Sequence, residues 1–443
     1  METTKIFTNI QTKIKQNYGY IIIGILSLVP LIFWIFAKPI NFRFVSSYAV
    51  LSSFGQIAGL IGMALFAINF IVASRLHFLE DLFNGMLNVY FAHRLLGTVS
   101  FILLLIHPLF LIFRLIPISL NAAALFILPS GANWPLNFGT FALLSMMFFL
   151  ALVIYNKLPY QILKLTHKFL GFSFFLGALH TFLIPSDVSQ FFPLKIYMVI
   201  LVSTGITFYT YRTFLGKYLA EKTEYSVQEI FQLNEHTLEI LMIPVERSIS
   251  FTPGQFIFVS FQDPVLGTES HPFSISSGTN DEHLKLTIKS LGDFTSKLES
   301  LKVGTVVNIE GPYGRFYDEV SDKDQIWIAG GVGVTPFLSM AKSINKSVNK
   351  VDLYYISKDK NDSVCIDNLC EISSKKENLR VLPFYTKIQG RINAQVINRI
   401  SNGLENKMIY LCGPIGMMQS LKSQFLKLNV PMQNIRTEEF AFL

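Results

Sequence analysis

The chain has only three cysteines among its 443 residues. Cys365 and Cys370 lack the spacing of a metal-binding cluster, and Cys412 stands apart from both. Three such cysteines provide no disulfide framework. The sequence also lacks a calcium-binding loop of the EF-hand type and a tail suited to binding a partner protein. We therefore expect neither a disulfide-stabilised fold nor an obligatory cytosolic activator.

Acidic residues are scarce in the first half of the chain. Residues 1–222 contain 15 Lys and Arg but only 5 Asp and Glu, whereas the remainder contains 22 and 25. A formal net charge of +7 could indicate nucleic-acid binding, but here the basic residues flank long apolar runs. We therefore expect contact with membrane lipid and no nucleic-acid binding.

Six apolar runs in the first half are long enough to cross a bilayer as helices. They lie at about residues 19–37, 47–73, 88–113, 136–155, 160–184 and 192–214. The first run ends in IFAKPI without a convincing cleavage site, so it is expected to remain as a helix. Most of the flanking lysines and arginines fall on one side of this topology. The positive-inside rule then predicts a multi-pass protein of the cytoplasmic membrane, with the amino terminus and the second half in the cytoplasm.

Two of these runs carry a histidine near each end. His93 and His107 lie in the third run, and His167 and His180 lie in the fifth. A spacing of fourteen residues separates the first two by roughly 21 Å along a helix, most of the ~30 Å hydrocarbon core. Imidazole is a strong axial ligand of haem iron and is costly in lipid unless it is coordinated or hydrogen-bonded. The pattern predicts two haems with two histidine ligands each; hydrogen bonds to neighbouring helices are the alternative.

The two runs differ in helical phase. Fourteen residues bring the first two histidines to within about 40° of each other, whereas thirteen leave roughly 140° between His167 and His180. Either the fifth helix is distorted, near Gly171 or Gly177, or the two haems are approached from different sides.

Three basic residues lie where they could meet haem propionates. Arg94 and Lys168 each directly follow a histidine near the expected cytoplasmic face, and Arg114 follows the apolar part of the same helix as Arg94. Basic residues at helix ends also reach the interface without any ligand, so this assignment has an ordinary alternative.

The second half changes to short alternating strands and turns, without another long apolar run. Its opening stretch predicts an antiparallel barrel, in which HPFSISS occupies residues 271–277. This segment resembles the flavin-binding signature of the ferric reductase and NADPH oxidase family, whose cytosolic half is similar to ferredoxin-NADP reductase. The resemblance covers nearly the whole chain, including the four histidines. Alone, HPFSISS could be an ordinary strand end.

The resemblance implies a bound FAD. The residues implied to line its isoalloxazine and ribityl parts are His271, Pro272, Phe273 and Ser274, with Ser274 able to hydrogen-bond the ring. The following stretch, implied to cover the FAD pyrophosphate, contains Lys289, Gly292, Asp293, Phe294 and Thr295. A short hydroxyl can polarise a flavin without adding charge, and a glycine lets backbone N–H groups approach phosphate.

Residues 321–443 alternate strands with helices, which predicts a parallel, doubly wound sheet. The strand IWIA runs into a glycine-rich turn made of Gly330, Gly331, Val332, Gly333, Val334, Thr335 and Pro336. Such a turn lets the backbone and the next helix approach an anion, with Thr335 as the expected N-cap and Pro336 as the first helical residue. Glycine-rich turns also occur for packing reasons, but this one resembles the family's GGxGxTP nicotinamide-nucleotide loop.

Three further segments match the family. Gly413 and Pro414 follow the strand MIYLC, whose last residue is Cys412. The resemblance implies that Cys412 and Gly413 lie near the nicotinamide; Cys412 can equally be a small buried strand residue. Ser357 and Lys358, with Arg391 assisting, could hold the 2′-phosphate of NADPH, which we favour over NADH, although exposed lysines usually face solvent.

The closing EEFAFL contains the aromatic that, by resemblance, stacks on the flavin and moves aside for nicotinamide. Phe440 is our first choice and Phe442 the second. The alternative is a last edge strand that buries alternate phenylalanines.

Together these patterns predict a membrane all-α six-helix haem bundle (residues 1–222), an antiparallel β-barrel FAD domain (223–320) and an α/β doubly wound nucleotide-binding domain (321–443). By resemblance, two electrons pass from NADPH to FAD and then singly through two b-type haems to an extracytoplasmic acceptor. Dioxygen, giving superoxide, is the first choice of acceptor, and a ferric or other metal complex is the second. A membrane component that feeds a separate periplasmic protein is a further alternative; a haem sensor or transporter would leave the flavin and nucleotide motifs unexplained.

Overall fold

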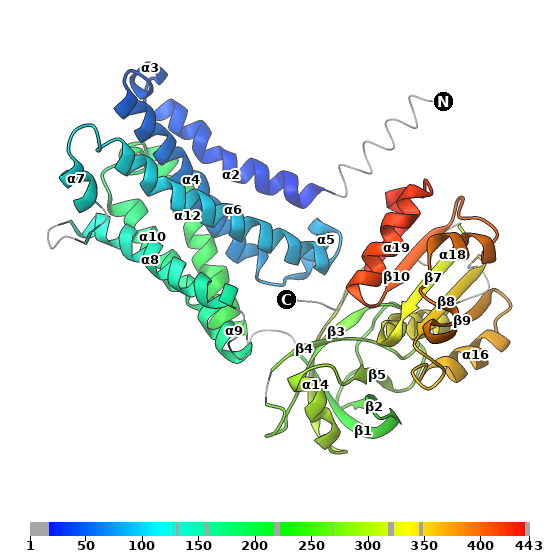
Figure 1. Cartoon of the computed structure of the whole chain (residues 1–443). Coiled ribbons are helices and arrows are strands. Elements are labelled where there is room, and N and C mark those ends of the chain that lie inside the picture. Colours follow the sequence, from blue (N-terminus) through cyan, green and yellow to red (C-terminus); the bar gives the residue numbers. More distant parts are fainter. Residues whose placement is uncertain are drawn as a thin grey trace. The chain divides into compact units, whose positions relative to one another are not determined.

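A computed structural model gives the structure of the protein. It describes residues 17–126, 128–129, 133–155, 158, 160–216, 222–267, 269–317, 323–344 and 349–438. The chain divides into two compact units, shown in Figure 1. The helical unit contains the described residues within 1–84 and 88–220, and the β-rich unit contains those within 85–87 and 221–443.

Among the described residues, six helical segments are long and apolar enough to cross a membrane. They are α2 (Tyr18–Ala37), α4 (Ser47–Val72), α6 (Met86–Phe113), α8 (Trp134–Tyr155), α9 with α10 (Tyr160–Lys168 and Leu170–Leu183) and α12 with the π-helical turn η1 (Phe192–Thr210 and Tyr211–Leu215). Shorter helices α3 (Ile40–Arg43), α5 (His77–Phe83), α7 (Leu120–Leu125) and α11 (Asp187–Gln190) lie between them. The six predicted spans are confirmed to within a few residues.

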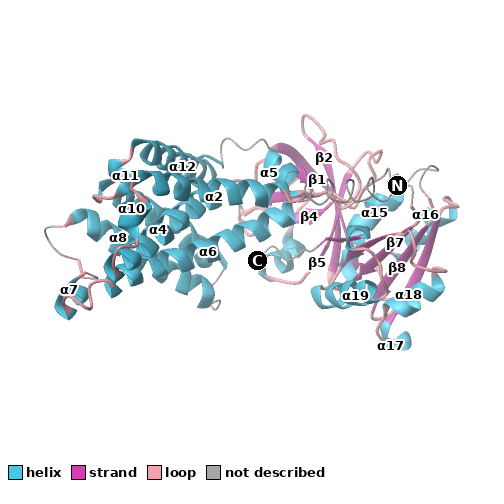
Figure 2. Ribbon diagram, turned by 90° about the horizontal axis from the view of Figure 1, so that it is seen from above, coloured by secondary structure: helices cyan, strands magenta, loops and turns pink. Residues whose placement is uncertain are grey.

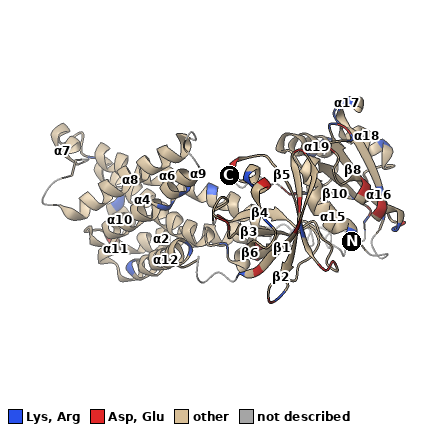
Figure 3. Ribbon diagram, turned by 90° about the horizontal axis from the view of Figure 1, so that it is seen from below, with Lys and Arg blue, Asp and Glu red and all other residues tan. Residues whose placement is uncertain are grey.

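Helix α4 forms the centre of the helical unit. Its most apolar stretch is 61% buried, against 11% for those of α6 and α8. The remaining helices therefore turn large apolar side chains outward, for example Ile25, Phe36 and Phe148. Such a surface suits contact with lipid rather than water. Figure 3 shows how few charged positions this unit carries compared with the β-rich unit.

The fifth span is distorted, which is one of the two alternatives that its helical phase left open, and the break lies two residues before Gly171. Helix α9 ends at Lys168 and α10 begins at Leu170, with Phe169 between them. Around this break, the Phe169 N–H donates to the Thr166 carbonyl at 3.1 Å and the Phe172 N–H donates to the Phe169 carbonyl at 2.9 Å. Longer α-helical bonds remain beside them, from the Phe169 N–H to the Leu165 carbonyl at 3.3 Å and from the Ser173 N–H to the Phe169 carbonyl at 3.4 Å, so the helix is tightened locally at the break.

The β-rich unit begins with an antiparallel lobe, the described residues of 222–317. Its strands are β1 (Thr223–Asn234), β2 (Thr237–Pro244), β3 (Phe256–Phe261), β4 (His271–Ser274), β5 (Leu284–Lys289) and β6 (Val306–Tyr313), in the order β4-β3-β6-β1-β2-β5. Helix α14 (Asp293–Lys297) and the turn η2 (Leu298–Ser300) follow β5. One isolated bridge, Ile275 with Leu286, links the two edges of the sheet. Complete closure into a barrel stays a prediction.

The parallel lobe, the described residues of 323–438, contains the second sheet. Its strands are β7 (Gln325–Gly330), β8 (Val351–Ser357), β9 (Leu379–Tyr385), β10 (Met408–Cys412) and β11 (Ile435–Glu438), in the order β11-β10-β7-β8-β9. The helices are α15 (Thr335–Ser343), α16 (Ile366–Ser374), α17 (Thr386–Gln389), α18 (Ala394–Ile400) and α19 (Ile415–Lys427), with the turns η3 (Gly331–Val334) and η4 (Met432–Asn434). Helices surround this sheet in Figure 2, and separate apolar cores cover its two faces.

Strand order reverses between β7 and β10, because β7 continues to β8 and β9 on one side while β10 and β11 lie on the other. In doubly wound sheets, ligands bind at the carboxyl ends of the strands beside such a reversal. The glycine-rich turn after β7 lies at this place.

Candidate functional site

Two histidine pairs lie inside the helical unit, each formed between α6 and the fifth span. The ring centroids of His93 and His167 are 5.9 Å apart, and those of His107 and His180 are 6.2 Å apart. Bonds of about 2 Å from one metal ion to an imidazole on each side would separate the ring centroids by roughly 6 to 6.5 Å. Both pairs therefore have the separation that ligation of a single iron by two histidines requires.

Backbone carbonyls orient the rings of the second pair. His107 Nδ1 lies 2.7 Å from the Gly55 carbonyl oxygen, and His180 Nδ1 lies 2.7 Å from that of Pro135. Because a carbonyl only accepts, each Nδ1 carries the proton and each Nε2 keeps a lone pair for a metal. The described residues give His93 Nδ1 no hydrogen bond of ordinary geometry, although the Asn69 carbonyl is close enough to interact with it.

Glycines on neighbouring helices make room for the second pair. A Cβ added to Gly59 would lie 2.8 Å from His107 Nδ1, and one added to Gly139 would lie 2.7 Å from His180 Nδ1. Both distances are too short for a real side chain, so these two positions need glycine. The sequence analysis missed both residues, because nothing in the sequence shows which glycine faces which histidine.

A cavity of about 300 Å³ adjoins His107 and His180. Its lining is mostly apolar, with Leu60, Met63, Leu104, Leu143 and Phe174 among the contributors. The residues present therefore fit a large, flat, apolar group with a metal at its centre: two imidazoles at the required separation, each with its Nε2 free of a proton, and an apolar cavity beside them.

The same cavity also touches a buried polar cluster that the sequence analysis missed. Asp187 accepts a hydrogen bond from Arg43 at 2.8 Å, and these side chains are only 4% and 3% exposed. The half-exposed Lys38 lies 3.0 Å from the other oxygen of Asp187. Arg43 also stacks 3.6 Å above the centre of the Trp34 ring, whose Nε1 donates to Gln56 at 2.9 Å. Trp34, Gln56 and Asp187 line the cavity.

The proposed propionate partners have protein partners of their own. Arg114 donates to the Ser52 hydroxyl at 2.9 Å and lies 5.0 Å above the Tyr48 ring. Arg94 lies 5.3 Å from the centre of the Phe91 ring. Their assignment to propionates stays a prediction, as does that of Lys168.

The predicted flavin segment forms strand β4. Ser274 at its end is buried, whereas His271, Pro272 and Phe273 are partly exposed. The His271 ring stacks on Phe294 with centroids 3.6 Å apart. The structure thus brings together the two segments that the resemblance assigned to the flavin ring and to its pyrophosphate.

In the predicted pyrophosphate stretch, the side chains of Thr295 and Asp293 hydrogen-bond to backbone groups of their own turn. The Thr295 hydroxyl accepts the backbone N–H groups of Leu291 and Gly292, at 2.9 and 3.0 Å, and Asp293 accepts that of Phe294 at 2.9 Å. A Cβ on Gly292 would meet nothing within 4 Å, so open space remains in front of this turn.

The two nucleotide turns pack backbone to backbone. A Cβ on Gly333 would lie 2.5 Å from the Cys412 carbonyl oxygen, so only glycine lets these turns touch. Gly331 has a φ of 55°, and a Cβ there would meet nothing within 4 Å, which leaves open space beside the turn. The structure thus brings together the predicted residues Gly330, Gly331, Val332, Gly333, Thr335, Pro336, Cys412, Gly413 and Pro414 at the carboxyl ends of β7 and β10.

The start of helix α15 differs from the prediction. The helix begins at Thr335 with Val334 as its N-cap, so Thr335 is not the cap and Pro336 is not the first helical residue. The Thr335 hydroxyl donates to the Val332 carbonyl at 3.0 Å instead of accepting from the helix. Val334, the last residue of the preceding turn η3, already has right-handed helical backbone angles, which explains the shift by one residue.

Cys412 contacts the glycine-rich turn through its backbone. Its side chain is fully buried beside Trp327 and Tyr410, and burial raises the pKa of the thiol well above its usual value. The thiol is therefore neutral near pH 7 and unsuited to nucleophilic chemistry.

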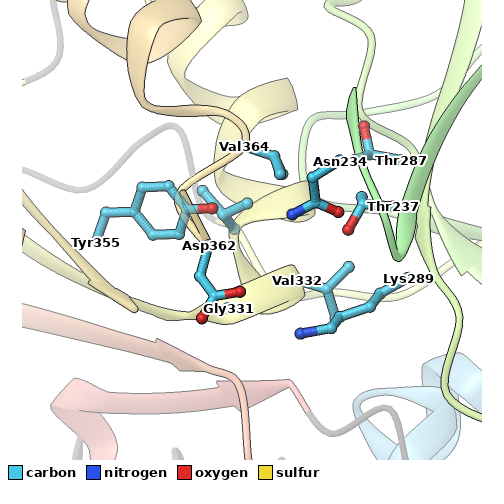
Figure 4. A pocket seen from close by; sticks show the side chains of 10 residues that line it. Asn234, Thr237, Thr287, Lys289, Gly331, Val332, Tyr355, Asp362 and Val364 are labelled. Carbon is cyan, nitrogen blue, oxygen red and sulfur yellow. The ribbon is translucent and has the colours of Figure 1, made fainter. Parts of the chain in front are cut away.

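Lys289, predicted beside the FAD pyrophosphate, lines a small crevice between the two lobes (Figure 4). Gly331 and Val332 border the same crevice, together with Tyr355 and Asp362. Its volume of about 10 Å³ is close to that needed for one water molecule. Sequence reasoning missed Tyr355 and Asp362, because they are ordinary strand and turn residues until the lobes are in contact.

The carboxyl ends of β8 and β9 carry the predicted ribose site. Lys387 after β9 donates to Asp359 after β8 at 2.6 Å, and this hydrogen bond lowers the pKa of Asp359 below its usual value. Ser357 is buried and bonded to Ser363 at 2.6 Å, whereas Lys358 and Arg391 are exposed. Lys387 was not among the predicted residues. Phe440 and Phe442 lie outside the described residues.

Three protein families match successive parts of the chain. Residues 58–178 match the family described as "Ferric reductase like transmembrane component". Residues 222–316 match the "FAD-binding domain" family, and residues 327–423 match the "Oxidoreductase NAD-binding domain" family.

Individual relatives each match less than half of the chain. The ferredoxin reductase component of 3-ketosteroid-9-alpha-monooxygenase from Mycobacterium tuberculosis is 28% identical over 203 residues, which cover 44% of this chain and 57% of that protein. A superoxide-generating NADPH oxidase heavy chain of Dictyostelium discoideum is 27% identical over 211 residues, 40% of each chain. The chain thus spans about half the length of the curated relatives it matches.

Among solved structures, flavohemoglobin from Malassezia yamatoensis has a TM-score of 0.50 and 18% identity, covering 89% of this chain and 98% of its own. This likeness concerns the fold alone. The three successive family matches show that the chain is an oxidoreductase that combines a ferric-reductase-like transmembrane component, with several helices long and apolar enough to span a membrane, with an FAD-binding and an NAD-binding domain.

Proposed function

We propose that this protein carries electrons from cytosolic NADPH through FAD and two b-type haems to an acceptor outside the membrane. The proposal is carried by the two histidine pairs of the helical unit, in which the ring centroids lie 5.9 Å apart in one pair and 6.2 Å apart in the other. The same chain contains the flavin and nucleotide domains. Flavin accepts a hydride and haem iron passes single electrons, so these groups supply the redox chemistry and the chain positions them.

The residues have separate roles in this proposal. Ser274 and the His271–Phe294 stack would position the flavin, and Gly331 would let the backbone approach the nucleotide phosphates. His93 with His167 would hold one haem and His107 with His180 the other. Because both irons would have two protein ligands, the acceptor would receive its electron at the haem edge.

The distribution of charge supports the orientation. The first half of the chain has three times as many basic as acidic residues, and most of them flank the spans on the side of the β-rich unit. By the positive-inside rule, that unit is cytoplasmic and the His107–His180 pair lies nearer the outer face.

We propose dioxygen as the acceptor, with a ferric complex as the second candidate. One NADPH and two dioxygen molecules would give NADP⁺, H⁺ and two superoxide ions, which balances the two electrons of the hydride. The relative named as a superoxide-generating NADPH oxidase heavy chain supports the same choice for its matched part. We propose no obligatory activator.

The experiment supplies the purified full-length protein with NADPH, FAD and haem under air. Reduction of cytochrome c is measured with and without superoxide dismutase, and then a ferric chelate is offered. Dismutase-sensitive reduction is expected. Dismutase-insensitive reduction confined to the chelate would overturn the choice of dioxygen and favour the second candidate.

The ligand assignment has its own test. His107→Leu should remove one haem's absorbance while flavin reduction by NADPH continues, as followed with a soluble dye. The matched control is His236→Leu, which replaces an exposed histidine of the antiparallel lobe and should keep both haems. Two haems in the His107→Leu variant would refute the assignment.

A further inference from the structure

The two lobes of the β-rich unit are joined by a small set of bonds at the end of helix α15. Lys342 Nζ donates to the Ser276 carbonyl at 3.1 Å and lies 3.4 Å from the Asp281 carboxylate. Beside it, the Ser343 hydroxyl accepts from the Thr279 backbone N–H at 3.1 Å. The Lys342 side chain is only 16% exposed. These contacts connect the parallel lobe to the segment that follows strand β4.

Helix α15 links this contact to the nucleotide turn. It begins directly after Gly331–Val334, its first seven residues are buried, and it spans about 13 Å over nine residues. At its carboxyl end, Lys376 donates to the carbonyls of Lys342 and Ile344, at 2.7 and 2.5 Å. Both ends of the helix are therefore held within the parallel lobe, so the helix and the nucleotide turn keep their places in that lobe.

The contacted segment is equally fixed to the predicted flavin strand. Ser276 lies two residues after Ser274, and its N–H donates to the Lys285 carbonyl of β5 at 2.9 Å. The Thr287 hydroxyl donates to that of Ser276 at 3.1 Å. A Cβ on Gly278 would lie 3.0 Å from the Cβ of Lys342, so α15 approaches this segment as closely as its backbone allows.

We propose that Lys342, with Ser343 beside it, is a positioning residue that sets the distance between flavin and nicotinamide. The proposal rests on the proposed function. In the step concerned, the nicotinamide C4–H bond breaks, the hydride with its electron pair goes to the flavin, and a bond from flavin nitrogen to hydrogen forms. Neither Lys342 nor Ser343 touches the reacting atoms. They hold the lobe that binds the nucleotide against the strand that carries the flavin.

Hydride transfer is sensitive to such placement. Reacting atoms must approach to about 3 to 3.5 Å, and a misplacement of about 1 Å can lower a rate by roughly a hundredfold. The nucleotide phosphates, by contrast, would bind at the other end of α15. Loss of the Lys342 contacts should therefore lower the rate of flavin reduction without weakening nucleotide binding.

The experiment measures flavin reduction by NADPH in the full-length protein without oxygen, in a stopped-flow instrument and normalised to bound flavin. The dependence on NADPH concentration gives a limiting rate and a dissociation constant separately. In Lys342→Met the limiting rate should fall about tenfold to a hundredfold, with the dissociation constant within about twofold of wild type. Lys342→Arg should restore most of the rate, and Ser343→Ala should show a smaller fall.

The matched control is Lys350→Met, which replaces an exposed lysine of the same lobe and should leave both constants unchanged. An unchanged limiting rate in Lys342→Met would overturn the proposal, whether the dissociation constant stays the same or increases. If Lys342→Met does not fold, equal rates in Ser343→Ala and wild type would overturn it. A wild-type flavin that neither NADPH nor NADH reduces would instead overturn the proposed function.

Discussion

At the scale of single residues, the ion pair between Asp359 and Lys387 bears directly on the choice of nucleotide. An acidic side chain after the second strand can accept from the free 2′-hydroxyl of NADH, whereas a cation suits the 2′-phosphate of NADPH. This chain has both, 2.6 Å apart on adjacent strand ends. Lys387 therefore neutralises the carboxylate that would repel NADPH.

Opposite changes of preference are expected at these two positions. Asp359→Asn should raise kcat/KM for NADPH relative to NADH, because it removes a negative charge and a 2′-hydroxyl acceptor. Lys387→Met should lower kcat/KM for NADPH relative to NADH. Each substitution should change the ratio by about tenfold, the effect of losing one charged hydrogen bond. The measurement is NADPH and NADH oxidation with a soluble dye. Glu371→Gln, which breaks another exposed 2.6 Å ion pair of the lobe, is the control, and an equal shift there would refute the assignment.

The three thiols should differ sharply in reactivity. Cys365 and Cys412 are buried, and burial raises the pKa of Cys365 to about 12, whereas Cys370 is exposed. Thiolate is the reactive form, so a maleimide should label one thiol per folded chain near pH 7 and three after denaturation. Mass spectrometry of the labelled peptides checks this. Labelling of Cys412 in the folded protein would contradict the packing of the two nucleotide turns.

At the scale of elements, the helix next to each histidine decides whether a haem fits. Gly139→Ala places a methyl group 2.7 Å from His180 Nδ1, so the ring must tilt and lose its hydrogen bond to Pro135. We expect loss of roughly one of the two haems per chain, because iron ligation tolerates little misplacement of its ligands. Haem content against bound flavin measures this.

The control for that variant lies on another membrane helix. Gly24→Ala on α2 adds the same methyl group where nothing lies within 4 Å, and it should keep both haems. Full haem content in Gly139→Ala would mean that the His107–His180 pair does not bind iron.

Element positions were largely predictable, but their internal details were not. Long apolar runs mark the spans because lipid requires them, and glycine-rich turns after strands mark nucleotide loops. The break at Phe169 and the early start of α15 at Thr335 depend on hydrogen bonds with neighbouring turns, which leave no signal in residue type. The buried Arg43–Asp187 pair likewise joins positions 144 residues apart, so sequence periodicity could not find it.

At the scale of the whole molecule, the two units differ in the charge and hydrophobicity of their surfaces. The helical unit has a mostly apolar surface and few charges, whereas the β-rich unit has charges of both signs and three apolar cores of its own. A unit with its own cores can in principle fold alone. Truncating the chain before Lys222 would then separate the proposed flavin and nucleotide sites from the proposed haem sites.

The cut is predicted to separate two activities. A chain from Lys222 to Leu443 should be soluble, bind FAD, show no Soret band and oxidise NADPH with ferricyanide at a rate within about threefold of the full protein, because flavin and nucleotide sites lie in one unit. It should lack the superoxide formation expected of the full chain, because the histidine pairs are missing. Absorbance spectra and dismutase-sensitive cytochrome c reduction are the measurements. Superoxide formation at the full-length rate would mean that electrons leave from the flavin and that the haem pathway is not needed.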